Sequence, residues 1–175
     1  MQHMSADPRF APAVITAASI MMLGGALLFQ YVGGLQPCVL CIYQRYPYAI
    51  AIALGLTALA LGSRPEGVKL SKLFVYACAA VFLAGMAVAA FHVGVEQKWW
   101  QGTAECHAPQ LPANATVEQL REILLNQPFA PCDRIPWELF GISIAGFNVL
   151  ASALLAALAF WAAFKLGALR KEARP

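Results

Sequence analysis

The chain has 175 residues, of which 60% are hydrophobic and 12% are charged, and its net charge is +3 at pH 7. Because an average soluble domain carries about 25% charged residues, this composition excludes an ordinary soluble domain and indicates a membrane protein. The small, scattered net charge also argues against binding to nucleic acid. We therefore expect a single membrane domain over residues 1–175.

The first apolar stretch, residues 11–32, has the roughly 20 residues that a helix needs to cross the hydrocarbon of a lipid bilayer. Its Gly24-Gly25 pair suits close contact with another helix. Arg9 is the only arginine or lysine before it, and no small-residue cleavage site ends it. We interpret the stretch as a retained transmembrane helix.

A Cys-x-x-Cys motif, formed by Cys38 and Cys41, follows where this stretch ends. Two thiols at this spacing can close into a disulfide or bind a metal. Arg45 lies four residues after Cys41, so a helix starting near Cys41 would place both on one face. Because a guanidinium favours a nearby thiolate, the motif predicts a redox dithiol at the membrane surface. The alternative for Arg45 is that its side chain only extends to the membrane interface.

Three more apolar stretches follow, at residues 42–61, 73–95 and 139–164. A short polar turn joins the first two of these, which predicts two antiparallel helices. The fold class that we predict is therefore an all-α integral membrane protein, an antiparallel bundle of four transmembrane helices. Its long external loop, residues 96–138, contains cysteines.

Within this loop, residues 117–125 have the pattern of a short amphipathic helix. Such a helix either lies on the membrane surface or packs within the loop.

Lysines and arginines are unequally distributed between the two sides of this predicted bundle. Eight lie in the N-terminal tail, the turn at 62–72 and the C-terminal tail, against four on the other side. The positive-inside rule then predicts that both termini are cytoplasmic. The loop cysteines would lie on the opposite side of the membrane, where disulfides persist.

Cys106 and Cys132, the cysteines of the long loop, leave several kinds of site open. They could form a stabilising disulfide, or an exposed disulfide that an outside thiolate can attack. With Cys38 and Cys41 they could also form a zinc site of four thiolates. However, 26 positions separate Cys106 from Cys132, whereas zinc sites usually contain two short-spaced pairs. We favour a relay of two redox pairs and predict no metal.

Two other side chains in the apolar stretches could carry chemistry. His92 lies near the outer end of the third stretch, four residues before Glu96. It is either an interfacial histidine with satisfied hydrogen bonds, or a residue that handles protons or faces a cofactor. Cys78 lies in the middle of the same stretch, where we expect it to pack as a small apolar residue.

The residues Leu35 to Arg45 read Leu-Gln-Pro-Cys-Val-Leu-Cys-Ile-Tyr-Gln-Arg, which resembles the signature of the DsbB family. Members of this family are bacterial inner-membrane quinone reductases that reoxidise a periplasmic thiol oxidase. Cys132-Asp133 and the segment Trp137 to Ser143 also resemble the family, as does the plan of four spans with one short and one long cysteine loop.

The resemblance implies a thiol:quinone oxidoreductase in the bacterial inner membrane. Its cofactor would be a membrane quinone, ubiquinone or menaquinone, and its partner a periplasmic DsbA-like thiol oxidase. Cys38 and Cys41 would be the pair next to the quinone, with Cys41 at the ring and Arg45 as its electrostatic partner. Cys106 and Cys132 would exchange with the oxidase, and Cys106 would form the mixed disulfide. His92 is the candidate for the family's quinone-linked histidine.

Two alternatives remain at this point. A quinone enzyme similar to vitamin K epoxide reductase also combines a Cys-x-x-Cys motif with loop cysteines in a helical bundle. The amino-acid sequence of the motif and its position after the first span favour the DsbB family. The other alternative is a non-catalytic membrane protein whose cysteines form structural disulfides or bind a metal.

Overall fold

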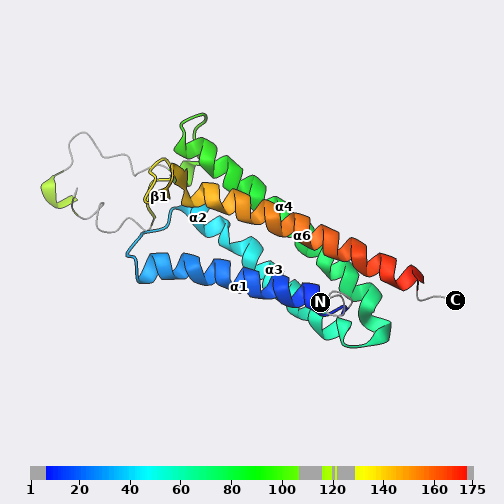
Figure 1. Ribbon diagram of the computed structural model, residues 1–175. Coiled ribbons are helices and arrows are strands. Elements are labelled where there is room, and N and C mark those ends of the chain that lie inside the picture. The colour runs from blue at the N-terminus through cyan, green and yellow to red at the C-terminus, as the bar shows by residue number, and fades with distance from the viewer. Residues whose placement is uncertain (1–6, 107–115, 120, 122–128, 173–175) are drawn as a thin grey trace.

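The computed structural model describes residues 7–106, 116–119, 121 and 129–172, and its main feature is a bundle of long helices (Figure 1). Within these residues, four helical segments are long and apolar enough to cross a membrane. They are α1 (Phe10–Tyr31), α2 with α3 (Val39–Tyr43 and Arg45–Gly62), α4 (Val68–Glu96) and α6 (Ile144–Glu172). The predicted all-α membrane bundle is confirmed. Both termini lie at one end of it, and α2 lies at the other.

The second and third helical segments start earlier than the sequence pattern indicates. The second begins at Val39, because the sulfur of Cys38 accepts a hydrogen bond from the backbone N–H of Cys41 over 3.2 Å and caps the helix. The third is preceded by a short 3-10 helix, η2 (Pro65–Gly67), so that α4 begins at Val68. The predicted polar turn is correspondingly short.

The start of the fourth predicted helix, at residue 139, is wrong, because a β-hairpin lies there. Strand β1 (Glu138–Leu139) pairs antiparallel with β2 (Ile142–Ser143). Phe140 and Gly141 form the turn between them, with φ angles of 53° and 74°. A two-residue hairpin turn requires this backbone, which glycine adopts at little cost. The helix α6 starts directly after β2.

The interior of the bundle is made largely from small side chains. Helix α4 packs most extensively against α6 and α3, and α1 packs against α3. Many residues of the buried core are alanines: Ala51, Ala58, Ala79, Ala89, Ala159 and Ala163. Larger apolar side chains such as Met21, Phe160 and Trp161 are 57–69% exposed. This distribution suits a bundle in lipid, where small residues let helices approach closely and apolar residues face outward.

The described parts of the long loop lie at the α2 end of the bundle. They include a short 3-10 helix, η3 (Ala104–Cys106), and the hairpin. In the predicted amphipathic stretch 117–125, residues 117–119 and 121 are helical. Thr116 and Gln119 exchange hydrogen bonds of 3.1 and 3.3 Å that cap this helical turn. The rest of that stretch lies outside the described residues.

Candidate redox site

Both predicted cysteine pairs lie in one buried cluster at the α2 end of the bundle. Cys106 and Cys132 form a disulfide, whereas Cys38 and Cys41 are free thiols whose sulfur atoms lie 3.0 Å apart. The members of the cluster are Cys38, Val39, Leu40, Val95, Cys106 and Cys132, with Cys41 packed against them. Two cysteine pairs that are distant in sequence thus lie in the same cluster, the arrangement that thiol–disulfide exchange between them requires.

Backbone hydrogen bonds hold the loop against the Cys-x-x-Cys motif. The N–H of Ala130 donates to the carbonyl oxygen of Pro37 over 3.3 Å, within a parallel bridge between Cys38 and Ala130. The N–H of Cys132 donates to the carbonyl oxygen of Cys106 over 3.2 Å. These contacts hold the segment that carries Cys132 against the backbone next to Cys38.

The two sulfur atoms of the motif differ in their surroundings. Cys38 is 4% exposed, and its thiol donates a hydrogen bond to the sulfur of Cys41. This hydrogen bond, together with burial, raises the pKa of the Cys38 thiol well above its usual range. Cys41 is half-buried and lines a cavity. In the reduced pair, Cys38 therefore keeps its proton and Cys41 is the acceptor.

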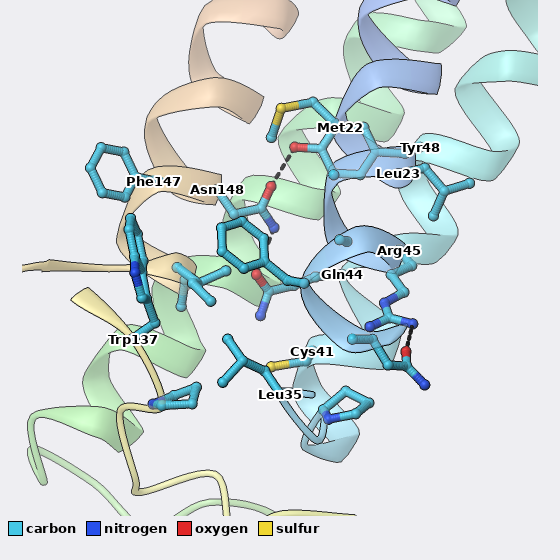
Figure 2. A pocket seen from close by; sticks show the side chains of 18 of the residues that line it. Met22, Leu23, Leu35, Cys41, Gln44, Arg45, Tyr48, Trp137, Phe147 and Asn148 are labelled. Carbon is cyan, nitrogen blue, oxygen red and sulfur yellow. Dashed lines mark hydrogen bonds between the residues drawn. The ribbon is translucent and has the colours of Figure 1, made fainter. Parts of the chain in front are cut away.

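The cavity beside Cys41 has a volume of about 370 Å³ and mainly apolar walls (Figure 2). Trp137 closes one side, with its ring 5.5 Å from that of Phe29 in α1 and 6.2 Å from that of Phe147 in α6. A few polar side chains also reach the cavity: Gln30, Gln36, Gln44, Arg45, Tyr48 and Asn148. An apolar cavity with a few polar groups is typical of a site for a small, largely apolar ligand.

Arg45 lines this cavity together with Cys41, as the one-turn spacing predicts. Its Nη1 donates a hydrogen bond of 2.6 Å to Oε1 of Gln30 in α1. Sequence reasoning missed Gln30, although a polar residue near the end of an apolar span is a signal that could have pointed to it. The guanidinium is thus held at the cavity rather than extended to the surface.

His92 lies behind Cys38 and, among the described residues, is not one that lines the cavity. It is 3% exposed, and its Nε2 lies 3.4 Å from the sulfur of Cys38 and 3.9 Å from Oε1 of Glu96. Its Nδ1 lies 2.8 Å from Nε2 of Gln44. Direct contact with a cofactor remains a prediction for His92. The redox-active group that lies beside it is the thiol of Cys38.

One group of potential metal ligands occurs among the described residues, formed by Cys38, Cys41 and His92 with their ligand atoms within 4.8 Å of one another. However, Gln44 places an N–H group against Nδ1 of His92. A neutral imidazole that accepts at Nδ1 carries its proton on Nε2, which then donates instead of binding a metal. The predicted alternative of four zinc thiolates is also disfavoured, because Cys106 and Cys132 are joined.

The loop disulfide is buried, contrary to the expectation of an exposed bond. Cys106 is 5% exposed and Cys132 is 0% exposed. A second cavity, of about 490 Å³, reaches Cys106 from the outside. Its lining includes two neighbouring tryptophans and three charged residues: Trp99, Trp100, Lys98, Asp133 and Arg134. Among the described residues, this cavity is therefore a route by which a reagent can approach the disulfide.

A membrane-spanning helical bundle with one formed disulfide and one close dithiol defines a class of membrane proteins built for thiol–disulfide chemistry. The chain matches the family model "Disulfide bond formation protein DsbB" over residues 8–162, and it therefore belongs to the DsbB family.

Two relatives that carry the family's name agree with this assignment, and a third relative is uncharacterized. A disulfide bond formation protein B of Aromatoleum aromaticum is 33% identical over 144 residues, 79% of this chain and 81% of the relative. Disulfide bond formation protein B 1 of Pseudomonas aeruginosa is 29% identical over 148 residues, covering 83% and 88%. An uncharacterized protein of Rickettsia prowazekii is 27% identical over 143 residues, covering 81% and 80%. No solved structure gives a significant match to the chain.

Proposed function

We propose that this protein is a thiol:quinone oxidoreductase of the bacterial inner membrane that reoxidises a periplasmic DsbA-like thiol oxidase. Electrons pass from the partner's dithiol through Cys106 and Cys132 to Cys38 and Cys41, and from there to a membrane quinone, ubiquinone or menaquinone. The observation that carries the proposal is the buried cluster that joins both cysteine pairs beside an apolar cavity.

The cavity fits a quinone headgroup in its chemistry. Its walls are mainly apolar, Cys41 lines it, and Arg45 and Asn148 offer N–H groups that suit carbonyl oxygens. When bound, a quinone accepts two electrons and two protons. Cys41 and Arg45 are the residues that would hold it, the first as the redox-active sulfur and the second as a cation that favours the thiolate.

The first exchange begins when a thiolate of the reduced partner attacks the sulfur of Cys106. Cys132 leaves as a thiolate, and the partner is joined to Cys106 by a mixed disulfide. The partner's second thiolate then attacks the partner's sulfur in this mixed disulfide. The partner leaves with its own disulfide formed, and Cys106 and Cys132 are both reduced. The second cavity, which reaches Cys106, supports this choice of attacked sulfur.

The second exchange returns these electrons to the membrane pair. With Cys38 and Cys41 oxidised, the thiolate of Cys132 attacks Cys38, its neighbour in the buried cluster, and Cys41 leaves as a thiolate into the cavity. Cys106 then attacks Cys132 and releases Cys38. The outcome is a disulfide between Cys106 and Cys132 and a reduced pair at Cys38 and Cys41, the same bonding that the structure has.

The orientation that we propose places both termini in the cytoplasm and the cysteine loops in the periplasm. Support comes from the excess of basic residues at the end of the bundle that holds the termini. At that end, the ammonium of Lys72 lies 5.6 Å from the ring centre of Tyr76. The ammonium of Lys165 lies 5.3 Å from the ring centre of Trp161. Aromatic and cationic side chains together are typical of a membrane interface.

The test is coupled turnover by the purified full-length protein. We expect oxidation of a reduced DsbA-like protein to consume added ubiquinone or menaquinone in equal amounts, and to stop in Cys41→Ser and Cys106→Ser. Thiol counts before and after quinone addition should fall by two per protein. If the thiol count does not change when quinone is added, the proposal is contradicted and a protein with purely structural disulfides is favoured.

A further inference from the structure

A chain of buried hydrogen bonds extends from the Cys-x-x-Cys motif into the bundle, and its direction is fixed at Gln44. The Nε2 group of Gln44 lies 3.2 Å from the carbonyl oxygen of Leu40 and 2.8 Å from Nδ1 of His92. A carbonyl oxygen only accepts, so the amide nitrogen must face Leu40. The two protons of this nitrogen are then used, one on Leu40 and one on His92. Gln44 is 6% exposed, which leaves water little access.

The chain continues from Gln44 to α6. Nδ2 of Asn148 donates to Oε1 of Gln44 over 2.6 Å (Figure 2). Oδ1 of Asn148 in turn accepts from the hydroxyl of Tyr48, and the hydroxyl of Ser152 lies 3.0 Å from that of Tyr48. Asn148 is 8% exposed, Tyr48 4% and Ser152 1%. Each amide is therefore held in one orientation by partners on both sides.

The donors that link one side chain of this chain to the next point toward the sulfur atoms. Because Nδ1 of His92 accepts from Gln44, the neutral ring carries its proton on Nε2. This nitrogen lies 3.4 Å from the sulfur of Cys38 and 3.9 Å from Oε1 of Glu96, so the sulfur is the nearer acceptor. The thiol of Cys38 then donates to the sulfur of Cys41 over 3.0 Å. Hydrogen bonds aligned in one direction polarise and strengthen one another, so negative charge on the last acceptor is stabilised most.

We propose that Gln44 and Asn148 are positioning residues for the dithiol. They fix the proton of His92 on Nε2, so that the chain of donors ends on Cys41 and the negative charge of the reduced pair lies on this sulfur. The inference rests on the proposed function in one respect only, namely that a thiolate facing the cavity is what the redox reaction needs. Without the chain, the ring of His92 could accept the proton of Cys38, and the hydrogen bond between the two thiols would be lost.

The first test measures where the thiolate lies, without quinone and without partner. The reduced full-length protein is treated with iodoacetamide over a range of pH, and modification of Cys41 is followed by mass spectrometry. The midpoint of this profile reports thiolate stability, whereas its plateau reports access of the reagent. We expect Asn148→Leu, which removes the donor at similar size, to move the midpoint to higher pH by about one unit, roughly a tenfold loss of thiolate below the midpoint.

Two single-hydroxyl variants serve as a matched pair. Tyr48→Phe removes a hydroxyl that belongs to the chain and should move the midpoint in the same direction by a smaller amount. Tyr46→Phe removes a hydroxyl two positions away on a side chain that is 56% exposed, and should leave the midpoint unchanged. An unchanged midpoint in Asn148→Leu, or a change confined to the plateau, would overturn the proposal.

The second test observes the tautomer of His92 directly. In protein labelled with ¹⁵N-histidine, the His92 signals, assigned by comparison with His92→Asn, should report a protonated Nε2 and an unprotonated Nδ1. A proton on Nδ1 contradicts the proposal. Because neither experiment needs turnover, a protein that fails to reduce quinone can still pass both, so failure of this inference and failure of the proposed function are distinguishable.

Discussion

Nη1 of Arg45 donates a hydrogen bond of 2.6 Å to Oε1 of Gln30, which joins the second span to the first beside the cavity that Cys41 lines. The bond holds a cation at the membrane pair, one helical turn after Cys41. Because desolvated surroundings screen charges weakly, the guanidinium can favour a nearby thiolate more than it would in water.

Neutralising this cation should slow the quinone step. We expect Arg45→Gln to reduce quinone at least roughly tenfold more slowly. The reason is that a nearby opposite charge typically lowers the pKa of an acidic group by about 1–3 units. Arg45→Lys should be intermediate, because it keeps the charge but loses the planar fork. Stopped-flow measurement of quinone absorbance checks the rates, and reduction of Cys106–Cys132 by a soluble dithiol serves as the control. Equal quinone kinetics in wild type and Arg45→Gln would show that the charge has no role.

A second prediction concerns the close contact between α1 and α3 at Gly55. A Cβ atom at this position would lie 2.3 Å from Oγ1 of Thr16, which itself donates to the carbonyl oxygen of Pro12 over 2.8 Å. We expect Gly55→Val to destabilise the bundle by about 1–3 kcal/mol, the usual cost of overpacking. Thermal unfolding in detergent measures this. Gly24→Val, where a Cβ meets nothing within 4 Å, is the matched control and should have a much smaller effect.

The sequence predicts the spans and the Cys-x-x-Cys motif well, because both depend on local composition and spacing. The hairpin after residue 138 is missed since Leu139, Phe140 and Ile142 are all apolar, and only the backbone angles at Phe140 and Gly141 separate it from a helix start. Hydropathy does not encode those angles. The buried state of the loop disulfide likewise depends on packing against Val95 and against Cys38, and Cys38 lies far from both loop cysteines in sequence.

The hydrogen-bond chain is missed for a related reason. Gln44 and Asn148 are 104 positions apart, and their contact depends on how α6 packs against the other helices. A signal was nevertheless present, since Asn148 and Ser152 are polar residues four apart in an apolar span. Such residues rarely face lipid and usually find partners inside a bundle.

A third prediction concerns Cys78, which the structure places in the core at 0% exposure, as expected for a small apolar residue. Its neighbours include Val75 and Phe82 of the same buried cluster. We expect Cys78→Ala to cost about 1 kcal/mol of stability for the lost sulfur atom, with unchanged rates of thiol exchange and quinone reduction. Thiol counts should fall by one. A loss of turnover in a variant that unfolds at the wild-type temperature would contradict this.

The last prediction concerns Gly102, which lines the second cavity and lies directly over Cys106. A Cβ atom at Gly102 would lie 2.7 Å from Cβ and 3.0 Å from Sγ of Cys106. Because Cys106 is only 5% exposed, a side chain added at Gly102 should narrow this approach to its sulfur. We expect Gly102→Ala to slow reduction of Cys106–Cys132 by a protein dithiol on the order of tenfold, which corresponds to about 1.4 kcal/mol in the barrier.

The measurement is the rate at which a reduced DsbA-like protein becomes oxidised when quinone is saturating, followed alongside quinone reduction by the chemically reduced variant. The second rate should stay at the wild-type value, since Gly102 is not among the described residues that line the cavity beside Cys41. Gly24→Ala is the control for the substitution itself, because its Cβ enters open space. An unchanged or faster reaction with the partner would mean that attack on the disulfide comes from another side, and that the second cavity is not the route to Cys106.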